Sequence, residues 1–442
     1  MLRDLLKNYL PADETLPAVP AALPVIEIPE FHFHKVALLF SNLPEAKQTV
    51  DIQPMEQFNQ GWGTILYRTT LPETTLAGAT LKITEVHDWA QIYADGKLLA
   101  RLDRRKGEFT TTLPALKKGT QLDILVEAMG RVNFDKSIHD RKGITEKVEL
   151  ISGNQTKELK NWTVYNFPVD YSFIKDKKYS DTKILPTMPA YYKSTFTLDK
   201  VGDTFLDMST WGKGMVWVNG HAMGRFWEIG PHQTLFMPGC WLKEGENEIL
   251  VLDLKGPTRA SIKGLKKPIL DVLREKAPET HRKDGEKLKL TGEKLAYEGT
   301  FTPGNGWQEV RFATPVKGRY FCLEALSPQA NDNIAAIAEF DVLGADGKPV
   351  SREHWKIRYA DSEETRSGNR TADKIFDLQE STFWMTVDNV PYPHQLVIDL
   401  SKVENVTGFR YLPRAEKGYP GMIREYRIFI KKEDFDYGKV AL

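Results

Sequence analysis

The chain has 442 residues, with 60 Lys and Arg against 60 Asp and Glu, so its formal net charge is zero. No basic excess exists to attract a polyanion, and the composition argues against nucleic acid as the main partner. Hydrophobic residues make up 41% and charged residues 27% of the chain, as in folded globular proteins. The longest apolar runs are far shorter than the roughly 18 residues that cross a bilayer, so we expect no membrane insertion.

The first thirty residues are predicted to form a short helix and a linker. In MLRDLLKNYLP the leucines recur near a 3.6-residue period up to Pro11, and no signal-peptide pattern is present. Prolines then recur up to Pro29, which favours extended backbone. A short helix with one apolar face is marginal alone, so we expect it to be the last helix of a domain upstream.

From about residue 31 onward the chain is predicted to be all-β. Short segments alternate apolar and polar side chains and end at Gly, Pro, Asn or Asp. Asp95-Gly96 and Asn219-Gly220 are typical of two-residue hairpin turns, which need positive φ at both central positions. We predict β-sandwiches at 31–165 and 166–262, a Lys- and Pro-containing linker with a brief helical pattern at 263–285, and a third strand-rich domain at 286–432.

Motifs of the common enzyme classes are absent. The sequence has no G-x-S-x-G, no H-E-x-x-H, no phosphate loop and no G-x-G-x-x-G that opens a helix. His32 and His34 share one face of a strand, but without a third ligand at suitable spacing we favour a half-exposed strand over a metal site. Two carboxylates can hydrolyse a glycosidic bond, yet nothing marks such a pair, and solvated surface carboxylates are the favoured interpretation. We predict no catalytic residue.

The aromatic residues suit a carbohydrate-binding protein. Ten Trp and sixteen Tyr lie on a predicted β framework, and flat ring faces stack on the apolar faces of sugars. For Trp211, Trp217 and Trp355 we favour the alternative that they fill the cores of the sandwiches.

Three runs of sequence carry a family resemblance. In chain order they are LYRTTL at 66–71 leading to VHDWA at 86–90, LVEAMGRVNF at 125–134 leading to DRKG at 140–143, and WGKGMVWVNGHAMGRFW at 211–227 leading to GPHQTLFMP at 230–238. They resemble the β-domains that follow the catalytic barrel of family-35 β-galactosidases. The resemblance implies two galactose-binding-like jelly rolls and no TIM barrel, because the family's catalytic glutamates lie in a barrel before these domains.

In the first domain, we expect the loop after Gly130 to face the barrel mouth of the whole enzyme that the resemblance implies. Its residues Arg131, Asn133 and Phe134 are the candidate carbohydrate contacts, although many relatives carry Tyr where Phe134 stands. Packing of this loop against the barrel is the alternative.

The third strand-rich domain resembles discoidin, or coagulation-factor C-type, domains, a fold shared by family-32 carbohydrate-binding modules. The matching runs are GRYFCL at 318–323, AAIAEFDV at 335–342, IFDLQESTFWMT at 375–386 and TGFRYLPRAEKGYPGMIREYRI at 407–428. The first two runs normally close the domain, whereas here they precede the others. We therefore expect a circularly permuted domain, which a sandwich with adjacent termini tolerates.

In many discoidin-like relatives an aspartate and a glutamate help to bind calcium. The matching residues are Asp377 and Glu339, with Thr382 nearby, so the resemblance implies a possible Ca²⁺ site as the only cofactor. The usual Asp-Gly is Asp377-Leu378 here, which compromises the expected tight turn. Sugar contacts are expected from the loop that holds Arg414 and Tyr419, and Tyr419 is either a stacking residue or merely an exposed loop tyrosine.

The resemblance implies the non-catalytic C-terminal portion of a β-galactosidase, an enzyme that removes terminal β-D-galactose by a two-carboxylate retaining mechanism. The expected partners are galactose-containing glycans and a catalytic TIM barrel outside this chain. The alternatives are a free-standing glycan-binding protein without hydrolase activity and, more weakly, a scaffold without sugar affinity. The family works in the periplasm, outside cells or in lysosomes.

Overall fold

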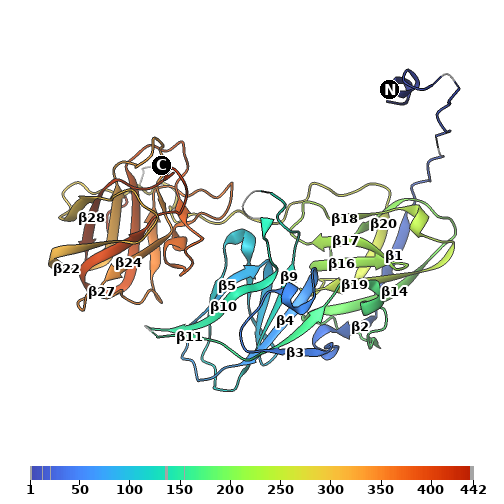
Figure 1. The fold of residues 1–442 in the computed structure, drawn as a ribbon, viewed down its shortest axis with the longest axis horizontal. Helices are drawn as coiled ribbons and strands as arrows, with labels where there is room; N and C mark the ends of the chain where they lie inside the picture. Colours follow the sequence, from blue (N-terminus) through green and yellow to red (C-terminus); the bar gives the residue numbers. More distant parts are fainter. Residues whose placement is uncertain (1, 12, 20, 135–137, 154, 439–442) are drawn as a thin grey trace. The chain divides into compact units, whose positions relative to one another are not determined.

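The computed structural model describes residues 2–11, 13–19, 21–134, 138–153 and 155–438 (Figure 1). The chain divides into two compact units, Met1–Leu43 with Val169–Glu275 and Pro44–Pro168 with Lys276–Leu442, and each is considered separately below. Within the described ranges, no helix has both the length and the apolar character that a membrane crossing requires.

The first unit is an antiparallel β-sandwich. One sheet has the strand order β1-β20-β15-β18 and the other the order β13-β2-β14-β19-β16-β17. Asn219 and Gly220, with φ of 48° and 87°, form the predicted turn of the β16–β17 hairpin. The elements are α1 (Leu2–Lys7), β1 (Ile28–His32), β2 (Lys35–Leu38), η1 (Leu39–Ser41), α2 (Tyr171–Ile174), β13 (Ser180–Asp181), β14 (Ala190–Leu198), β15 (Thr204–Asp207), β16 (Lys213–Val218), β17 (His221–Trp227), β18 (Thr234–Met237), η5 (Gly239–Trp241), β19 (Gly245–Asp253) and β20 (Ser261–Leu265).

Two boundaries of this unit differ from the sequence-based expectation. Strand β1 pairs with β20 and β2 pairs with β14, so residues 28–38 belong to this sandwich and not to the domain expected at 31–165. Strand β20 extends to Leu265, and residues 266–285 contain no helix. The first boundary differs because β1 and β2 pair with strands more than 150 positions away in the sequence. At the second boundary, Pro268 lacks the backbone N–H that a helix needs.

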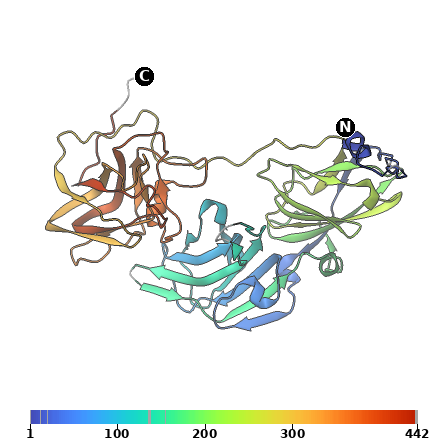
Figure 2. The same ribbon diagram turned by 45° about the horizontal axis from the view of Figure 1, so that its top comes forward.

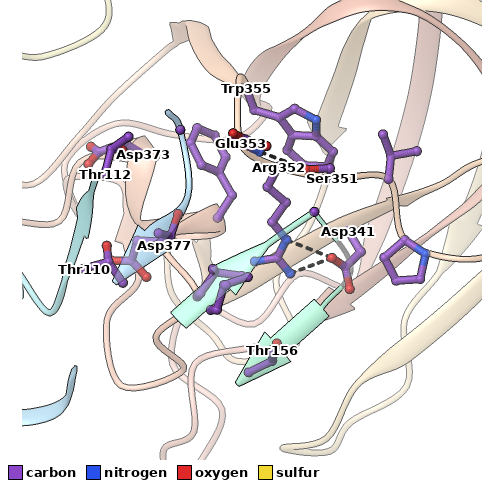
Figure 3. A pocket seen from close by; sticks show the side chains of 18 of the residues that line it. Thr110, Thr112, Thr156, Asp341, Ser351, Arg352, Glu353, Trp355, Asp373 and Asp377 are labelled. Carbon is purple, nitrogen blue, oxygen red and sulfur yellow. Dashed lines mark hydrogen bonds and ion pairs between the residues drawn. The ribbon is translucent and has the colours of Figure 1, made fainter. Parts of the chain in front are cut away.

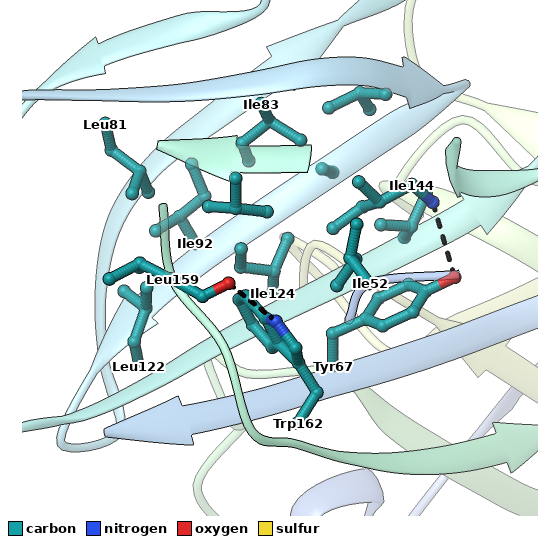
Figure 4. Close-up of a cluster of buried hydrophobic side chains, with 14 of the residues drawn as sticks. Ile52, Tyr67, Leu81, Ile83, Ile92, Leu122, Ile124, Ile144, Leu159 and Trp162 are labelled. Atoms are coloured by element: carbon teal, nitrogen blue, oxygen red, sulfur yellow. Dashed lines mark hydrogen bonds between the residues drawn. The ribbon is translucent and has the colours of Figure 1, made fainter. Parts of the chain in front are cut away.

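The second unit begins with another sandwich, whose sheets have the orders β11-β10-β5-β8 and β3-β12-β4-β9-β6-β7. Figure 4 shows its core, where the Trp162 indole donates to the Leu159 carbonyl at 3.1 Å and the Ile144 amide donates to the Tyr67 hydroxyl at 3.3 Å. The elements are β3 (Ala46–Thr49), η2 (Met55–Phe58), β4 (Gly63–Thr70), β5 (Thr80–His87), β6 (Trp89–Ala94), β7 (Lys97–Asp103), η3 (Arg104–Lys106), β8 (Thr110–Thr112), β9 (Gln121–Ala128), β10 (Gly143–Ser152), β11 (Gln155–Glu158) and β12 (Trp162–Phe167).

A C-terminal sandwich completes the second unit (Figure 2). Its main sheet has the order β21-β28-β22-β27-β24, with β25 also on β27, and β23 pairs with β26. Its first and last strands, β21 and β28, are hydrogen-bonded neighbours, so the ends of this sandwich are adjacent. The elements are β21 (Leu295–Thr300), β22 (Gln308–Ala325), β23 (Ala336–Ile337), β24 (Glu339–Leu343), β25 (Lys356–Ala360), η6 (Ala372–Phe376), β26 (Trp384–Met385), β27 (His394–Leu412) and β28 (Glu425–Lys431).

The all-β prediction is confirmed, and the described residues form no cylinder of alternating strands and helices. Trp211, Trp217 and Trp355 are 1%, 1% and 6% exposed, so all three fill cores as we favoured. Trp211, for example, meets the rings of Phe33 and Tyr192 edge to face at 5.0 and 5.1 Å. Alternating strand residues supply this burial, which stabilises each sandwich by roughly 25 cal/mol per Å² of apolar surface removed from water.

Candidate functional site

The loop that joins β9 to β10 holds three of the candidate residues. Arg131 lies 2.6 Å from a Glu56 carboxylate oxygen and donates to the Asp140 and Gly61 carbonyls at 2.9 and 2.7 Å. Asn133 is exposed, and Phe134 is 80% exposed. Arg131 is thus engaged in holding the loop, whereas Asn133 and Phe134 face outward, free to meet a ligand or another domain.

A ring of buried charges lies under this loop. The Lys142 ammonium is 2.7 Å from an oxygen of Asp88 and 2.7 Å from an oxygen of Asp140, with 0% of its side chain exposed. Arg104 reaches the second oxygens of the same two carboxylates at 2.8 and 2.7 Å. Two cations and two anions therefore neutralise one another, which satisfies the rule that buried charges are paired.

The same ring holds the backbone of the loop. Asp88 accepts the Met129 amide at 2.6 Å, Asp140 accepts the Val132 amide at 3.1 Å, and Lys142 donates to the Gly130 carbonyl at 2.9 Å. Burial by itself raises the pKa of the Asp140 carboxyl, but bonds from Lys142, the Val132 amide and Arg104 outweigh it and lower that pKa to about 2. The Asp140 carboxyl is therefore ionised at all but strongly acidic pH, and the ring fixes the base of the loop.

Sequence reasoning missed the residues of this ring. Asp88 belongs to VHDWA, and Asp140 and Lys142 belong to DRKG, two runs that we used only to recognise a resemblance. The signal was the presence of charged residues inside apolar β motifs, because charges are rarely buried unless they are paired. Their pairing across 54 residues, from Asp88 to Lys142, is visible only in the structure.

The C-terminal sandwich brings the three candidate metal ligands together. The Gln379 amide donates to Glu339 at 2.7 Å and to Asp377 at 3.0 Å, and the Thr382 hydroxyl lies 2.9 and 2.8 Å from the two Asp377 oxygens. Burial, together with the nearby charge of Glu339, raises the pKa of the Asp377 carboxyl well above its usual range. These oxygens are the hard ligands that calcium prefers.

Protein cations, however, already lie on these carboxylates. An Arg352 guanidinium nitrogen contacts Glu339, another lies 2.6 Å from Asp341, and Figure 3 shows the paired bonds to Asp341. Lys374 lies 3.9 Å from Asp377. No group of three or more His, Cys, Asp or Glu residues suited to a metal occurs within the described ranges. The residues do not fit a calcium ion, because Arg352 supplies positive charge where an ion would need ligands.

The turn after Asp377 is formed despite the missing glycine. Leu378 adopts a φ of 64°, in the left-handed region that side chains with a Cβ rarely enter. The expectation of a compromised turn was therefore wrong about geometry. The strain of order 1 kcal/mol is offset by the hydrogen bonds that the Gln379 amide makes to both carboxylates.

Arg414 and Tyr419 lie in the loop between β27 and β28. Arg414 stacks over the Phe383 ring at 4.5 Å and pairs with Glu416. Arg370 lies over the same ring at 4.2 Å, so two guanidinium groups cover one aromatic side chain. Tyr419 is half-buried with a φ of 56° and accepts the Met422 amide on its carbonyl at 3.1 Å. Tyr419 is thus a turn residue as well as a partly exposed ring.

Other candidates from the sequence are less developed. The rings of His32 and His34 lie 6.3 Å apart and both residues are exposed, in keeping with a half-exposed strand. A pocket of about 790 Å³ in the second unit includes Asp341, Arg352 and Trp355 in its lining (Figure 3). Arg352 and Asp341 bond to each other there, so these two charges are paired within the pocket wall.

Comparison with protein families assigns most of the β-domains. Residues 53–168 match "Beta-galactosidase, first all-beta domain", residues 189–247 match "Beta-galactosidase, galactose-binding domain", and residues 359–441 match "F5/8 type C domain". The last match lies on the later half of the C-terminal sandwich.

Curated relatives point the same way. The chain is 34% identical over 205 residues to human beta-galactosidase-1-like protein 2, covering 45% of this chain and 30% of that protein. It is 33% identical over 222 residues to a beta-galactosidase of Xanthomonas manihotis, covering 50% and 36%. It is 31% identical over 325 residues to the Bos taurus beta-galactosidase, covering 64% and 46%. The chain therefore spans less than half the length of each of these relatives.

Solved structures superpose only weakly on the whole chain. A lectin from Pleurotus ostreatus in complex with GalNAc covers 55% of this chain with a TM-score of 0.20 and 12% identity, and this chain covers 80% of the lectin. A score this low does not relate the two folds.

Proposed function

We propose that this chain, whose domains are the non-catalytic all-β domains of β-galactosidases followed by an F5/8 type C domain, supports a catalytic barrel and binds galactose-containing glycans. In the whole enzyme, the barrel would hydrolyse terminal β-D-galactose with its own carboxylate pair. The chain by itself is then inactive. Turnover of a chromogenic β-galactoside above background by the purified chain would contradict this assignment.

One observation carries the supporting role. The β9–β10 loop has a base fixed by three buried charges, Asp88, Asp140 and Lys142, and by the partly buried Arg104. The loop exposes Phe134 at 80% and Ile138 at 60%. Exposed apolar side chains on a rigid base are typical of surfaces that bury them against a partner. In this proposal Phe134 and Asn133 contact the barrel mouth or its sugar, and Arg131 keeps them in place.

The supporting role is testable in trans. The catalytic barrel of the Xanthomonas manihotis relative, expressed without its β-domains, is mixed with this chain, and its Tm and its hydrolysis of p-nitrophenyl β-galactoside are measured. We expect the chain to raise both, and Phe134→Ala to weaken the effect roughly tenfold. The matched control is Phe236→Ala, because Phe236 is 51% exposed on another sandwich. A barrel that is unaffected by a saturating amount of chain would refute the supporting role.

The glycan-binding role is assigned to the C-terminal sandwich. Arg414 offers guanidinium donors beside an aromatic ring, and Tyr419 offers a partly exposed ring on the same loop. Aromatic faces stack on sugars while charged groups hydrogen-bond their hydroxyls. We expect a glycan array to show binding to galactose-terminated glycans that Tyr419→Ala and Arg414→Ala each weaken. Tyr9→Ala and Arg311→Ala serve as matched exposed controls, and unchanged binding in the first pair would remove this site.

This binding is proposed to be independent of calcium. The guanidinium of Arg352 contacts Glu339, one of the two candidate ligand carboxylates, and also its neighbour Asp341, so a protein cation already lies at this place. We expect the same glycan affinity in the presence of calcium and of a chelator. A loss of affinity on chelation would overturn this part of the proposal and leave the glycan-binding role standing.

A further inference from the structure

A hollow of about 470 Å³ in the first unit concentrates positive charge. The lysines that line it are Lys35, Lys175, Lys177, Lys178 and Lys193. Asp181 is the one carboxylate in the same lining. The chain as a whole has a net charge of zero, so this local excess is not a consequence of its composition.

The backbone register forces two of these lysines together. Lys35 of β2 lies directly opposite Lys193 of β14, so both side chains leave the same face of the sheet. Like charges directly opposite on neighbouring strands destabilise a sheet. Lys193 relieves part of the repulsion, because its ammonium lies 2.5 Å from Glu248. That carboxylate also accepts the Tyr171 hydroxyl at 2.7 Å. On its other side, Lys35 has Asp181 of β13 as its register partner.

The remaining lysines are weakly compensated. Lys175 is 4.0 Å from the exposed Asp176. Lys177 lies over the Phe173 ring at 3.4 Å, and burial lowers its pKa because the charged form is partly desolvated there. Within the described part of the chain, Lys35, Lys177 and Lys178 have no carboxylate partner within ion-pair distance. The hollow therefore holds ammonium groups from three separate segments, β2, residues 175–178 and β14, with few internal counter-charges.

We propose that this lysine hollow binds the anionic substituent of a glycan, a sulfate ester or a carboxylate on a galactose-rich saccharide. Ammonium groups are point charges on mobile stems, so they can converge on an anion without the fixed fork geometry of arginine. The volume is in the range of sites that hold small ligands, roughly 300 to 1,000 Å³. The glycan part of this inference rests on the proposed function, whereas the anion part rests on the lysines alone.

The test is calorimetric titration of the full chain with matched oligosaccharides. The probes are a sulfated galactan oligosaccharide, its unsulfated counterpart of equal length, and an oligogalacturonate for the carboxylate case. We expect at least one charged probe to bind more tightly than the unsulfated one, with an affinity that falls as salt rises. The double variant Lys35→Gln/Lys178→Gln should weaken that binding roughly tenfold. Lys117→Gln/Lys118→Gln, an exposed pair in the other unit, is the charge-matched control.

A second measurement separates lost binding from lost folding. Because Lys35→Gln removes a like-charge pair with Lys193 and an opposite-charge pair with Asp181, we expect its Tm to stay nearly unchanged while its anion affinity falls. Failure of both charged probes to bind, or equal weakening by the control pair, would overturn the proposal. Equally tight binding of a DNA duplex would overturn the glycan assignment. None of these outcomes changes the result expected when the chain is mixed with the catalytic barrel or tested on the array of galactose-terminated glycans. Failure of this proposal is therefore distinguishable from failure of the proposed function.

Discussion

The two sandwiches of the second unit each bury a cluster of charges, and the clusters are used differently. In the first sandwich, hydrogen bonds to backbone groups of the β9–β10 loop are made by Asp88, Asp140 and Lys142 in addition to their ion pairs. In the C-terminal sandwich, Arg352 bonds side chain to side chain with Glu339 and Asp341. The first cluster therefore positions a segment, while the second fills a place where a cation would lie. The first cluster bonds three backbone groups of one loop, whereas the second bonds mainly side chain to side chain, with Glu339 also accepting the Gln379 amide.

The largest effect is expected from breaking the first cluster. Lys142→Met leaves Asp88 and Asp140 buried with Arg104 as their main remaining cation, which should lower the free energy of unfolding by about 4 kcal/mol. Urea denaturation measures this loss. Lys157→Met, which breaks an exposed pair with Glu73, should change stability little. Equal effects of the two variants would contradict the importance of the ring.

Breaking the second cluster should have a smaller but more informative effect. Arg352→Leu frees Glu339, leaves Asp341 with Arg410 as its partner, and should cost about 3 kcal/mol. If Arg352 fills the position of a cation, calcium should then raise the Tm of the variant more than magnesium does, and should leave the Tm of the unaltered chain unchanged. Arg319→Leu, which breaks the more exposed pair with Asp399, should gain no calcium response. A calcium response of the unaltered chain would refute this comparison.

Acid should loosen the first cluster in a defined range of pH. The pKa of Asp140 is lowered from 3.8 to about 2 in the folded chain, so its contribution is complete above pH 3.8 and is lost as pH falls through about 2. The loss should amount to about 1 to 2 kcal/mol, measured as urea midpoints against pH. Asp140→Asn should be less stable at neutral pH and should show a flatter pH profile in this range. A profile identical to that of the unaltered chain would contradict the assignment.

The smallest expected effect concerns the turn beside the second cluster. Leu378→Gly removes a Cβ from a residue with a φ of 64° and should raise stability by less than about 1 kcal/mol. Leu326→Gly, at a partly buried position outside the positive-φ residues, should lower stability instead. A loss of stability in both variants would show that packing of the Leu378 side chain contributes more to stability than its positive φ costs.

Local patterns predicted much of the fold. Alternation and Gly-containing turns indicated an all-β chain, and the turn at Asn219-Gly220 lies where the pattern placed it. The sequence could not predict which sandwich β1 and β2 belong to. Their partners, β20 and β14, are far away in the sequence, and nothing in the local pattern of β1 or β2 selects one partner strand over another. The segment after Leu265 was expected to be a linker with a brief helical pattern, because its apolar residues recur with a short helix-like period. The structure has no helix there.

The candidate sites show the same division. The motifs brought Asp377, Glu339 and Thr382 to notice, but only the fold placed Arg352, from a different segment, on Glu339. Likewise, the motifs contained Asp88 and Lys142 without indicating that the two residues meet. Sequence spacing says which side chains share a strand face, whereas ion pairing depends on which strands and loops become neighbours.

The sequence by itself determined the all-β fold class of this protein. Alternating apolar residues, hairpin turns and long motif runs are features of short stretches or of their order along the chain, so they can be recognised without knowing the fold. Only the tertiary structure decided what the charged residues do. Whether a carboxylate is free to hold an ion, anchors a loop or is neutralised by an arginine depends on atoms brought within about 3 Å from distant segments. The same applies to the lysine hollow, where the fold brings Lys35 and Lys193, which face each other on β2 and β14, beside the basic run at 175–178.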